Sequence, residues 1–162
     1  MLDSWQIDTR RFAERGERID QQLTVAQLPR LRQECVGPFE PVDVSVLGVR
    51  SPRGKPGVRV ALRAAIRVRC QRCLKPMAIE LTPVSSFEWV STEAELDAGD
   101  KDDEWDSVIA STLFDLVPLL EDELLLAVPY AALHPACNPT GATEAGEKLS
   151  PFAALSGLKA LK

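Results

Sequence analysis

The stretch VRVALRAAIRVRC, residues 58–70, decides how this chain folds. Its even-numbered positions hold only valine, leucine, alanine, isoleucine and cysteine, whereas four of its odd-numbered positions are arginines: Arg59, Arg63, Arg67 and Arg69. Successive side chains of a β-strand point to opposite faces, so a period of two over this length predicts a strand with one buried face and one arginine face.

A second segment, MAIELTPVSSFEWV at 77–90, alternates in the same way. If Cys70 faces Met77 across the turn, apolar residues of the two segments meet on one face, with Val58 opposite Trp89. On the other face Arg59 meets Glu88 and Arg67 meets Glu80. This register pairs apolar residues on one face and opposite charges on the other, and it therefore predicts an antiparallel hairpin 58–70/77–90.

The remaining elements are predicted from periodicity and caps. FEPVDVSVLGV predicts a third strand near 39–49, and the leucine spacing of DLVPLLEDELLLAVP predicts an amphipathic helix near 115–128 that Asp115 caps and Pro129 ends. Short N-terminal helices are expected over TRRFAERG, capped by Asp8, and over 29–34, begun by Pro29. The fold class is therefore α+β, with an antiparallel β-sheet packed against the 115–128 helix.

The domain organisation follows from composition. Residues 1–137 are expected to form a single α+β domain, in which the charged stretch 91–106 is a solvated loop. The segment 138–149 is typical of a flexible linker, and SPFAALSGLKALK predicts a short C-terminal helical tail over 150–162.

Charge is unevenly distributed in this chain of 162 residues with a net charge of −5. Nine basic residues and no acidic ones lie between Val44 and Ile79, whereas fourteen acidic residues and one lysine lie between Glu80 and Leu126. The total argues against indiscriminate phosphate binding. No apolar stretch approaches the roughly 20 residues of a membrane span, so we expect a cytoplasmic protein without membrane partners, whose four cysteines are thiols or ligands.

The C-x-x-C pair in CQRCLK, residues 70–75, has three interpretations. A redox pair needs a helix N-terminus to activate its thiol, and here the pair lies between strands. A structural zinc ion needs four ligands, and His134 and Cys137 of HPAC would complete a Cys3His set with Cys70 and Cys73. The third interpretation is a turn with two idle thiols and a histidine near the helix end. We favour this metal-free alternative, because the fourth ligand would be a lone histidine beside a proline.

The arginine face has two interpretations. It is either a stripe for RNA phosphates or a solvated face with cross-strand ion pairs. In the predicted register Arg63, Arg69, Arg72 and Lys75 have no acidic partner, and these four are the candidate RNA contacts.

Three blocks of the sequence together resemble one family. CQRCLKPM, LLEDELLLAVPYAALHPAC and SPFAALSGLK are similar, in this order, to the YceD family of large ribosomal RNA subunit accumulation proteins. The resemblance implies a ribosome-biogenesis role in the accumulation or processing of 23S ribosomal RNA, with no established enzymatic activity. Many members look rich in cysteine after the position of Cys137, whereas this chain continues CNPTGATEAGEK.

Three classes of function compete. The first is a non-catalytic factor that binds large-subunit rRNA or a pre-ribosomal particle. The second is an enzyme, against which the chain offers one histidine flanked by proline and no recognisable catalytic constellation. The third is a protein adaptor that docks ribosomal proteins or assembly factors without touching RNA.

Overall fold

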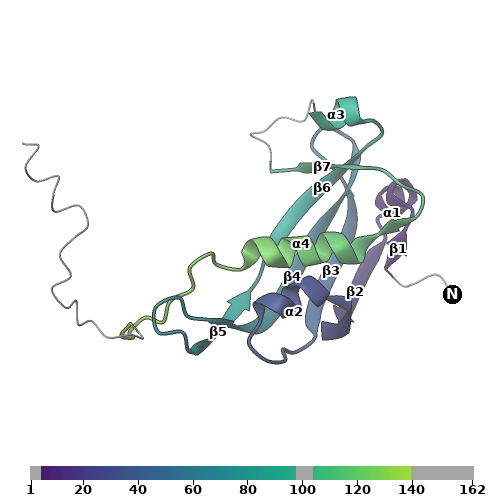
Figure 1. Cartoon of the computed structure of the whole chain (residues 1–162). Coiled ribbons are helices and arrows are strands. Elements are labelled where there is room, and N and C mark those ends of the chain that lie inside the picture. The colour runs from purple at the N-terminus through teal and green to yellow at the C-terminus, as the bar shows by residue number, and fades with distance from the viewer. Residues whose placement is uncertain (1–4, 98–103, 140–162) are drawn as a thin grey trace, which may run out of the picture.

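The computed structural model describes residues 5–97 and 104–139 and confirms the α+β class. Figure 1 shows its elements. In chain order they are β1 (Gln6–Ile7), α1 (Thr9–Arg15), β2 (Arg18–Leu23), the 3-10 turn η1 (Val25–Gln27), α2 (Pro29–Glu34), β3 (Val42–Arg50), β4 (Pro56–Arg69), β5 (Pro76–Leu81), β6 (Val84–Val90), α3 (Glu93–Asp97), β7 (Asp106–Ile109), β8 (Phe114–Asp115) and α4 (Leu116–Ala127).

The long strand β4 is the centre of the main sheet. It pairs with β3 on one side and with both β5 and β6 on the other, in the order β2-β3-β4-β6-β7 with β5 beside β4. Every pairing is antiparallel except that of β6 with β7, and β1 pairs separately with β8. The even-numbered residues of β4 from Val58 to Val68 are buried and the odd-numbered ones from Arg59 to Arg69 are exposed, as the alternation predicts.

The register of the hairpin differs from the prediction by two residues. Val58 faces Phe87 instead of Trp89, and the second segment is two strands, β5 and β6, separated at Thr82 and Pro83. A slip of two residues keeps every side chain on its predicted face, so hydrophobic alternation cannot detect it.

The slip changes the partners of the arginines. Arg59 faces Ser86 and lies 5.8 Å from the ring centroid of Trp105, while Arg67 faces Ala78. The predicted pairs of these two arginines with Glu88 and Glu80 are therefore wrong. Instead Arg63, predicted to lack an acidic partner, places Nε 2.6 Å from Oε1 of Glu80.

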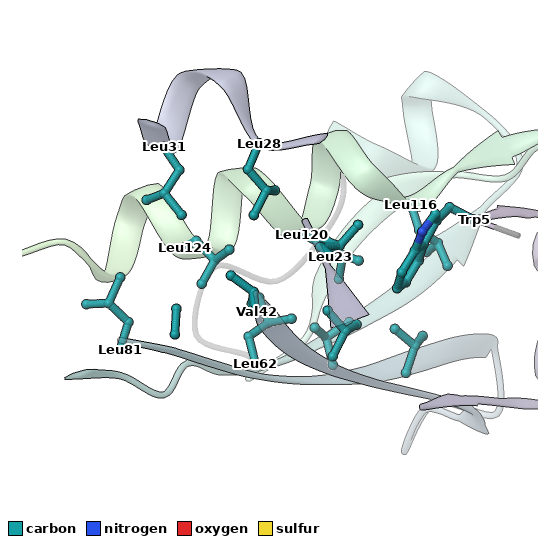
Figure 2. Close-up of a cluster of buried hydrophobic side chains, with 14 of the residues drawn as sticks. Trp5, Leu23, Leu28, Leu31, Val42, Leu62, Leu81, Leu116, Leu120 and Leu124 are labelled. Atoms are coloured by element: carbon teal, nitrogen blue, oxygen red, sulfur yellow. The ribbon is translucent and has the colours of Figure 1, made fainter. Parts of the chain in front are cut away.

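The core lies between the even face of the sheet and the helices. Figure 2 shows Leu120 and Leu124 of α4 pointing toward Val42, Leu62 and Leu81 of the sheet, with leucines at the start of α2 above them. The core leucines of α4 and of the start of α2 are fully buried: Leu28, Leu31, Leu116, Leu120 and Leu124. The predicted helix near 115–128 is confirmed, and the Asp115 carboxylate accepts the Val117 N–H at 3.0 Å as its cap.

Both predicted N-terminal helices are confirmed. The carboxylate of Asp8 accepts the Arg11 N–H at 3.1 Å to cap α1, and Gly16 ends that helix with a φ of 58°. Helix α1 packs so closely on β3 that a Cβ at Gly48 would lie 2.3 Å from the Phe12 carbonyl oxygen. Only a residue without a side chain fits at this crossing.

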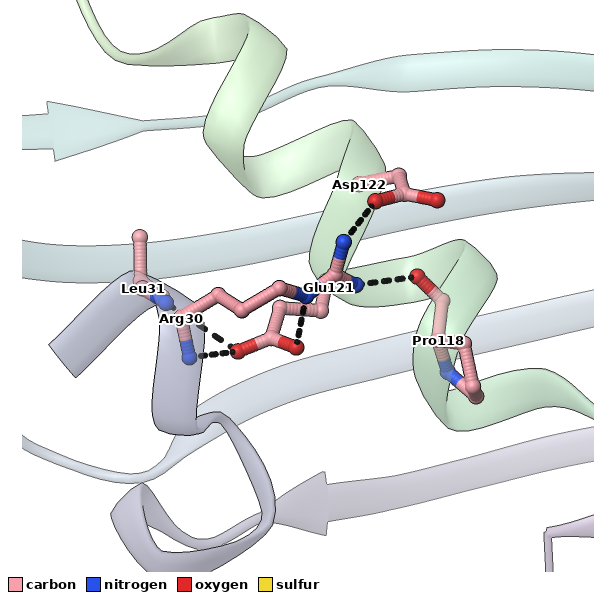
Figure 3. Close-up of polar contacts among 5 residues, drawn as sticks. All are labelled: Arg30, Leu31, Pro118, Glu121 and Asp122. Atoms are coloured by element: carbon pink, nitrogen blue, oxygen red, sulfur yellow. Dashed lines mark hydrogen bonds and ion pairs between the residues drawn. The ribbon is translucent and has the colours of Figure 1, made fainter. Parts of the chain in front are cut away.

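A buried carboxylate from α4 holds the start of α2, whose own N-cap residue offers no side-chain acceptor. Glu121 Oε1 accepts the backbone N–H groups of Arg30 and Leu31 at 2.7 and 3.0 Å, and its Oε2 accepts Arg30 Nε at 2.8 Å (Figure 3). The Arg30 guanidinium also reaches Asp122 Oδ1 at 2.5 Å and the Pro118 carbonyl at 3.1 Å. Glu121 of α4 therefore caps the N-terminus of α2, as a side chain of the N-cap residue does in other helices.

The predicted solvated loop 91–106 is only partly irregular. It contains α3 and the buried Trp105, and it leads directly into β7. Of the predicted linker 138–149, only residues 138 and 139 are described, and the predicted tail 150–162 lies outside the described residues. None of the described helices combines the length and apolar character needed to cross a membrane.

Candidate metal centre

The C-x-x-C pair occupies a tight turn between β4 and β5. The Cys70 N–H donates to the Lys75 carbonyl at 3.0 Å, and the Leu74 N–H donates to the Cys70 carbonyl at 3.0 Å. Leu74 has a φ of 58°, the left-handed conformation that lets the chain reverse within this short span. Both thiols are turned inward: Cys70 is fully buried and Cys73 is 6% exposed.

The second pair reaches this turn from the segment that follows α4. The helix ends at Ala127, before Pro129, and the chain then runs back to β4, where the Gln71 N–H donates to the Ala132 carbonyl at 2.9 Å. The His134 N–H lies 3.5 Å from Cys70 Sγ, and Arg72 Nη1 donates to the Cys137 carbonyl at 3.3 Å. One hydrogen bond between backbones and two that involve side chains therefore join the two cysteine-containing segments.

The four candidate ligands converge. One donor atom each from Cys70, Cys73, His134 and Cys137 lies within 4.8 Å of all the others. The Cys70 and Cys137 sulfurs are 3.8 Å apart, and Cys73 Sγ is 3.2 Å from His134 Nδ1. Zinc–sulfur bonds of about 2.3 Å in tetrahedral geometry separate two sulfurs by about 3.8 Å and a sulfur and a nitrogen by about 3.6 Å. The cluster is thus close to the size that a tetrahedral zinc ion requires.

The electrostatic surroundings prepare Cys70 as a ligand. Burial by itself raises the pKa of this thiol, but backbone N–H groups of Cys73, His134 and Arg72 point at Sγ and lower the pKa to about 5. Burial, together with the neighbouring sulfurs of Cys70 and Cys73, raises the pKa of Cys137. A turn that stabilises one thiolate beside further sulfur donors is suited to a cation, because metals bind the deprotonated form.

The four predicted RNA contacts do not share one environment. Arg69 ends β4, and Arg72 and Lys75 lie in the exposed turn beside the cluster. Within 5–97 and 104–139 these three side chains form no ion pair, whereas Arg63 is paired with Glu80. Lys75 also lines a hollow of about 580 Å³ with Cys73, His134 and Cys137.

The sequence analysis missed Tyr130, which lies between the helix and the second ligand pair. Its side chain is fully exposed, an unusual position for an aromatic ring. The signal was available in the sequence, because this is the only tyrosine of the chain and it directly follows the proline that ends α4.

Comparison with known proteins assigns the chain to a family. No solved structure matches it significantly. Residues 58–159 match the family model described as large ribosomal RNA subunit accumulation protein YceD. The match begins in β4 and includes both ligand pairs. Since it covers well over half of the sequence, this chain belongs to the YceD family of large ribosomal RNA subunit accumulation proteins.

Proposed function

We propose that this protein is a non-catalytic cytoplasmic factor that supports accumulation of 23S rRNA by binding the RNA or a pre-ribosomal particle. The family description names large-subunit rRNA accumulation and no reaction. The surface that would make the contact is the end of the molecule formed by the β4–β5 turn and the segment after α4, which we call the metal end.

The metal end is proposed to hold one structural zinc ion. The observation that carries this proposal is the convergence of the three sulfurs and one nitrogen, drawn from segments about sixty residues apart. Zinc with three thiolates has a net charge of −1, and Arg72 and Lys75 are positioned in the turn to offset it. The ion would fasten the tip of the hairpin to the chain that follows α4, so its binding would add to folding stability.

Metal analysis of protein purified without chelators tests the zinc site. We expect about one zinc per chain, lost in Cys73→Ser but kept in Cys35→Ser, since Cys35 lies outside the cluster. A chelator should lower the melting temperature of the wild-type protein and leave that of the Cys73→Ser variant unchanged. An unchanged wild-type melting temperature after chelation, or equal zinc content in the Cys73→Ser variant, would refute the site.

RNA contact is proposed to use Arg69, Arg72 and Lys75. Their side chains are exposed and form no ion pair within the described ranges, so a phosphate need not displace a carboxylate. Arg63 is a weaker candidate, because binding a phosphate would require it to leave Glu80.

Charge reversal tests this assignment. Arg69→Glu should weaken RNA binding and make the salt dependence shallower by about one unit of slope. Arg50→Glu is the matched control, because Arg50 is also exposed and forms no ion pair within the described ranges. Arg50 pairs with Pro56, at the other end of β4. Pro56 lies about 43 Å along β4 from Arg69 at roughly 3.3 Å per residue. Equal effects of the two variants would mean that only total charge matters.

A protein adaptor is the second candidate. The exposed side chains of Leu74, Leu126 and Leu133 favour it, because apolar groups on the surface near one site often contact a protein. Binding assays separate the candidates: binding to naked rRNA supports the first, and binding only to protein-containing particles supports the second. In either case depletion should lower mature large-subunit rRNA relative to small-subunit rRNA, and unchanged rRNA ratios would count against both.

A further inference from the structure

Tyr130 is exposed beside a hollow at the metal end. The hollow has a volume of about 500 Å³, within the range of about 300–1,000 Å³ typical of small-ligand pockets. It lies between the end of α2, the end of β4 and the segment after α4. The tyrosine ring is therefore adjacent to a concave surface large enough for a nucleobase.

The lining of the hollow combines groups that suit a nucleotide. Val128 and Ala132 contribute apolar surface, and the side chains of Gln33 and Gln71 can donate to and accept from the edge of a base. Arg69 is the cation of the lining and is free of ion pairs in the part of the chain that the structure describes. Glu34 is the one acidic residue of the lining. Arg72, which directly follows the lining residue Gln71 in the turn, is exposed.

The aromatic segment is held in place from both ends. Pro129 precedes Tyr130 at the end of α4, and the hydrogen bond from Gln71 to the Ala132 carbonyl anchors the chain two residues later. Two residues further along the chain, His134 contacts Cys70 and Cys73 and holds the segment a second time. A ring whose backbone is fixed loses little entropy when a base stacks on it.

We propose that Tyr130 is a stacking platform for an unpaired base of single-stranded rRNA, with Arg69 contacting the adjacent phosphate. An exposed aromatic ring beside a cation without an acidic partner is the arrangement by which proteins bind single strands. A paired base within a duplex cannot stack in this way, because its faces are covered by its neighbours. The inference rests on the proposed function and specifies the RNA as single-stranded.

The test compares a single-stranded RNA of about 12 nucleotides with a duplex of the same sequence. Tyr130→Ala should bind the single strand roughly 5- to 150-fold more weakly, with little change for the duplex. Tyr130→Phe keeps the ring and should bind like the wild type. Val84→Ala is the matched control, since it removes another exposed apolar side chain, 74% exposed, from β6, outside the metal end.

A direct readout is available because the chain has one tyrosine. Protein labelled with 3-fluorotyrosine should show one fluorine resonance, and its shift should change on addition of the single strand but not of the duplex. This signal also detects stacking in a folded wild-type sequence, independently of any variant.

The outcomes separate this inference from the proposed function. If Arg69→Glu weakens RNA binding while Tyr130→Ala binds single strands normally, the stacking site is refuted and the RNA-binding function stands. If wild-type protein binds neither RNA, the stacking site and direct RNA contact are both refuted, and the adaptor candidate is favoured. If Tyr130→Ala loses binding only to ribonuclease-treated particles, the occupant of the hollow is a protein, and the nucleobase proposal is overturned.

Discussion

Removing the Glu121 carboxylate should destabilise the protein more than its position on a mostly polar helix face suggests. In Glu121→Ala the backbone N–H groups of Arg30 and Leu31 lose their acceptor, and Leu31 is fully buried. An unsatisfied buried donor costs about 1–3 kcal/mol, so two cost about 2–6 kcal/mol. The Arg30 side chain is 46% exposed and can return to water at little cost, which places the expected loss near the middle of this range, at about 3–4 kcal/mol.

Two further variants divide this loss into its parts. Glu121→Gln keeps one oxygen for the two backbone donors but loses the charge and turns an amide N–H₂ toward Arg30 Nε, so we expect about 1–2 kcal/mol. Asp122→Asn removes only the ion pair at the exposed carboxylate, which is 53% exposed, and should cost less than about 0.5 kcal/mol.

Urea unfolding measures these differences, provided that the slope of free energy against urea is the same in all variants. For a chain of this length the Glu121→Ala loss corresponds to a fall in melting temperature of roughly 10 °C. A loss below about 1 kcal/mol for Glu121→Ala, or an equal loss for Asp122→Asn, would refute the view that Glu121 caps α2.

Three other perturbations test separate parts of the structure. Gly48→Ala should cost about 1–3 kcal/mol, because its Cβ would lie 2.3 Å from the Phe12 carbonyl oxygen and push α1 away from β3; an unchanged thermal melt would contradict this close contact. Glu80→Gln should strengthen RNA binding by releasing Arg63, and weaker binding in a filter assay would show that the acidic partner is needed. In zinc-free protein the free energy of unfolding should rise as the pH increases from about 5 toward 9, because folded Cys70, with its pKa lowered from 9.0 to about 5, has lost a proton that the unfolded chain still holds. Cys70→Ser should flatten that rise, and a decrease over the same pH interval would show that the thiolate is not stabilised in the fold.

The sequence predicts those elements whose signals are local. Strand β4 and helices α1 and α4 carry clear periodicity or caps, and all three are found. Strand β2 was missed because its sequence RIDQQL is polar on both faces apart from Ile19 and Leu23. Strand β7 lies in an acidic segment and exists through its backbone pairing with β6, which composition does not reveal.

For the strand register and the candidate metal site too, the sequence predicts what is local and not what depends on the path of the chain. Alternation determines which face of β4 is buried, but the two-residue slip depends on the turn at Leu74 and on the break at Pro83, whose geometry no periodicity encodes. The four candidate ligands were grouped by residue type alone. The sequence analysis favoured the metal-free alternative because the fourth ligand would be a lone histidine beside a proline. The convergence of the four residues depends on the path of the chain after α4, which no local pattern encodes.

The position of α4 in the chain has a consequence for synthesis on the ribosome. The apolar face of β4 is complete when residue 69 has been made. Helix α1, made earlier, packs near Gly48 and its partner Val58, but α4, which covers the rest of this face, ends at Ala127, about 58 residues later. At roughly 5–20 residues per second that part of the sheet spends about 3–12 s without α4 during each round of translation. In that interval the residues that α4 will cover, among them Val42 and Leu62, are available to other nascent chains and to chaperones. A slower stretch of translation between β6 and α4 would lengthen this exposure, and the yield of soluble protein should fall with it.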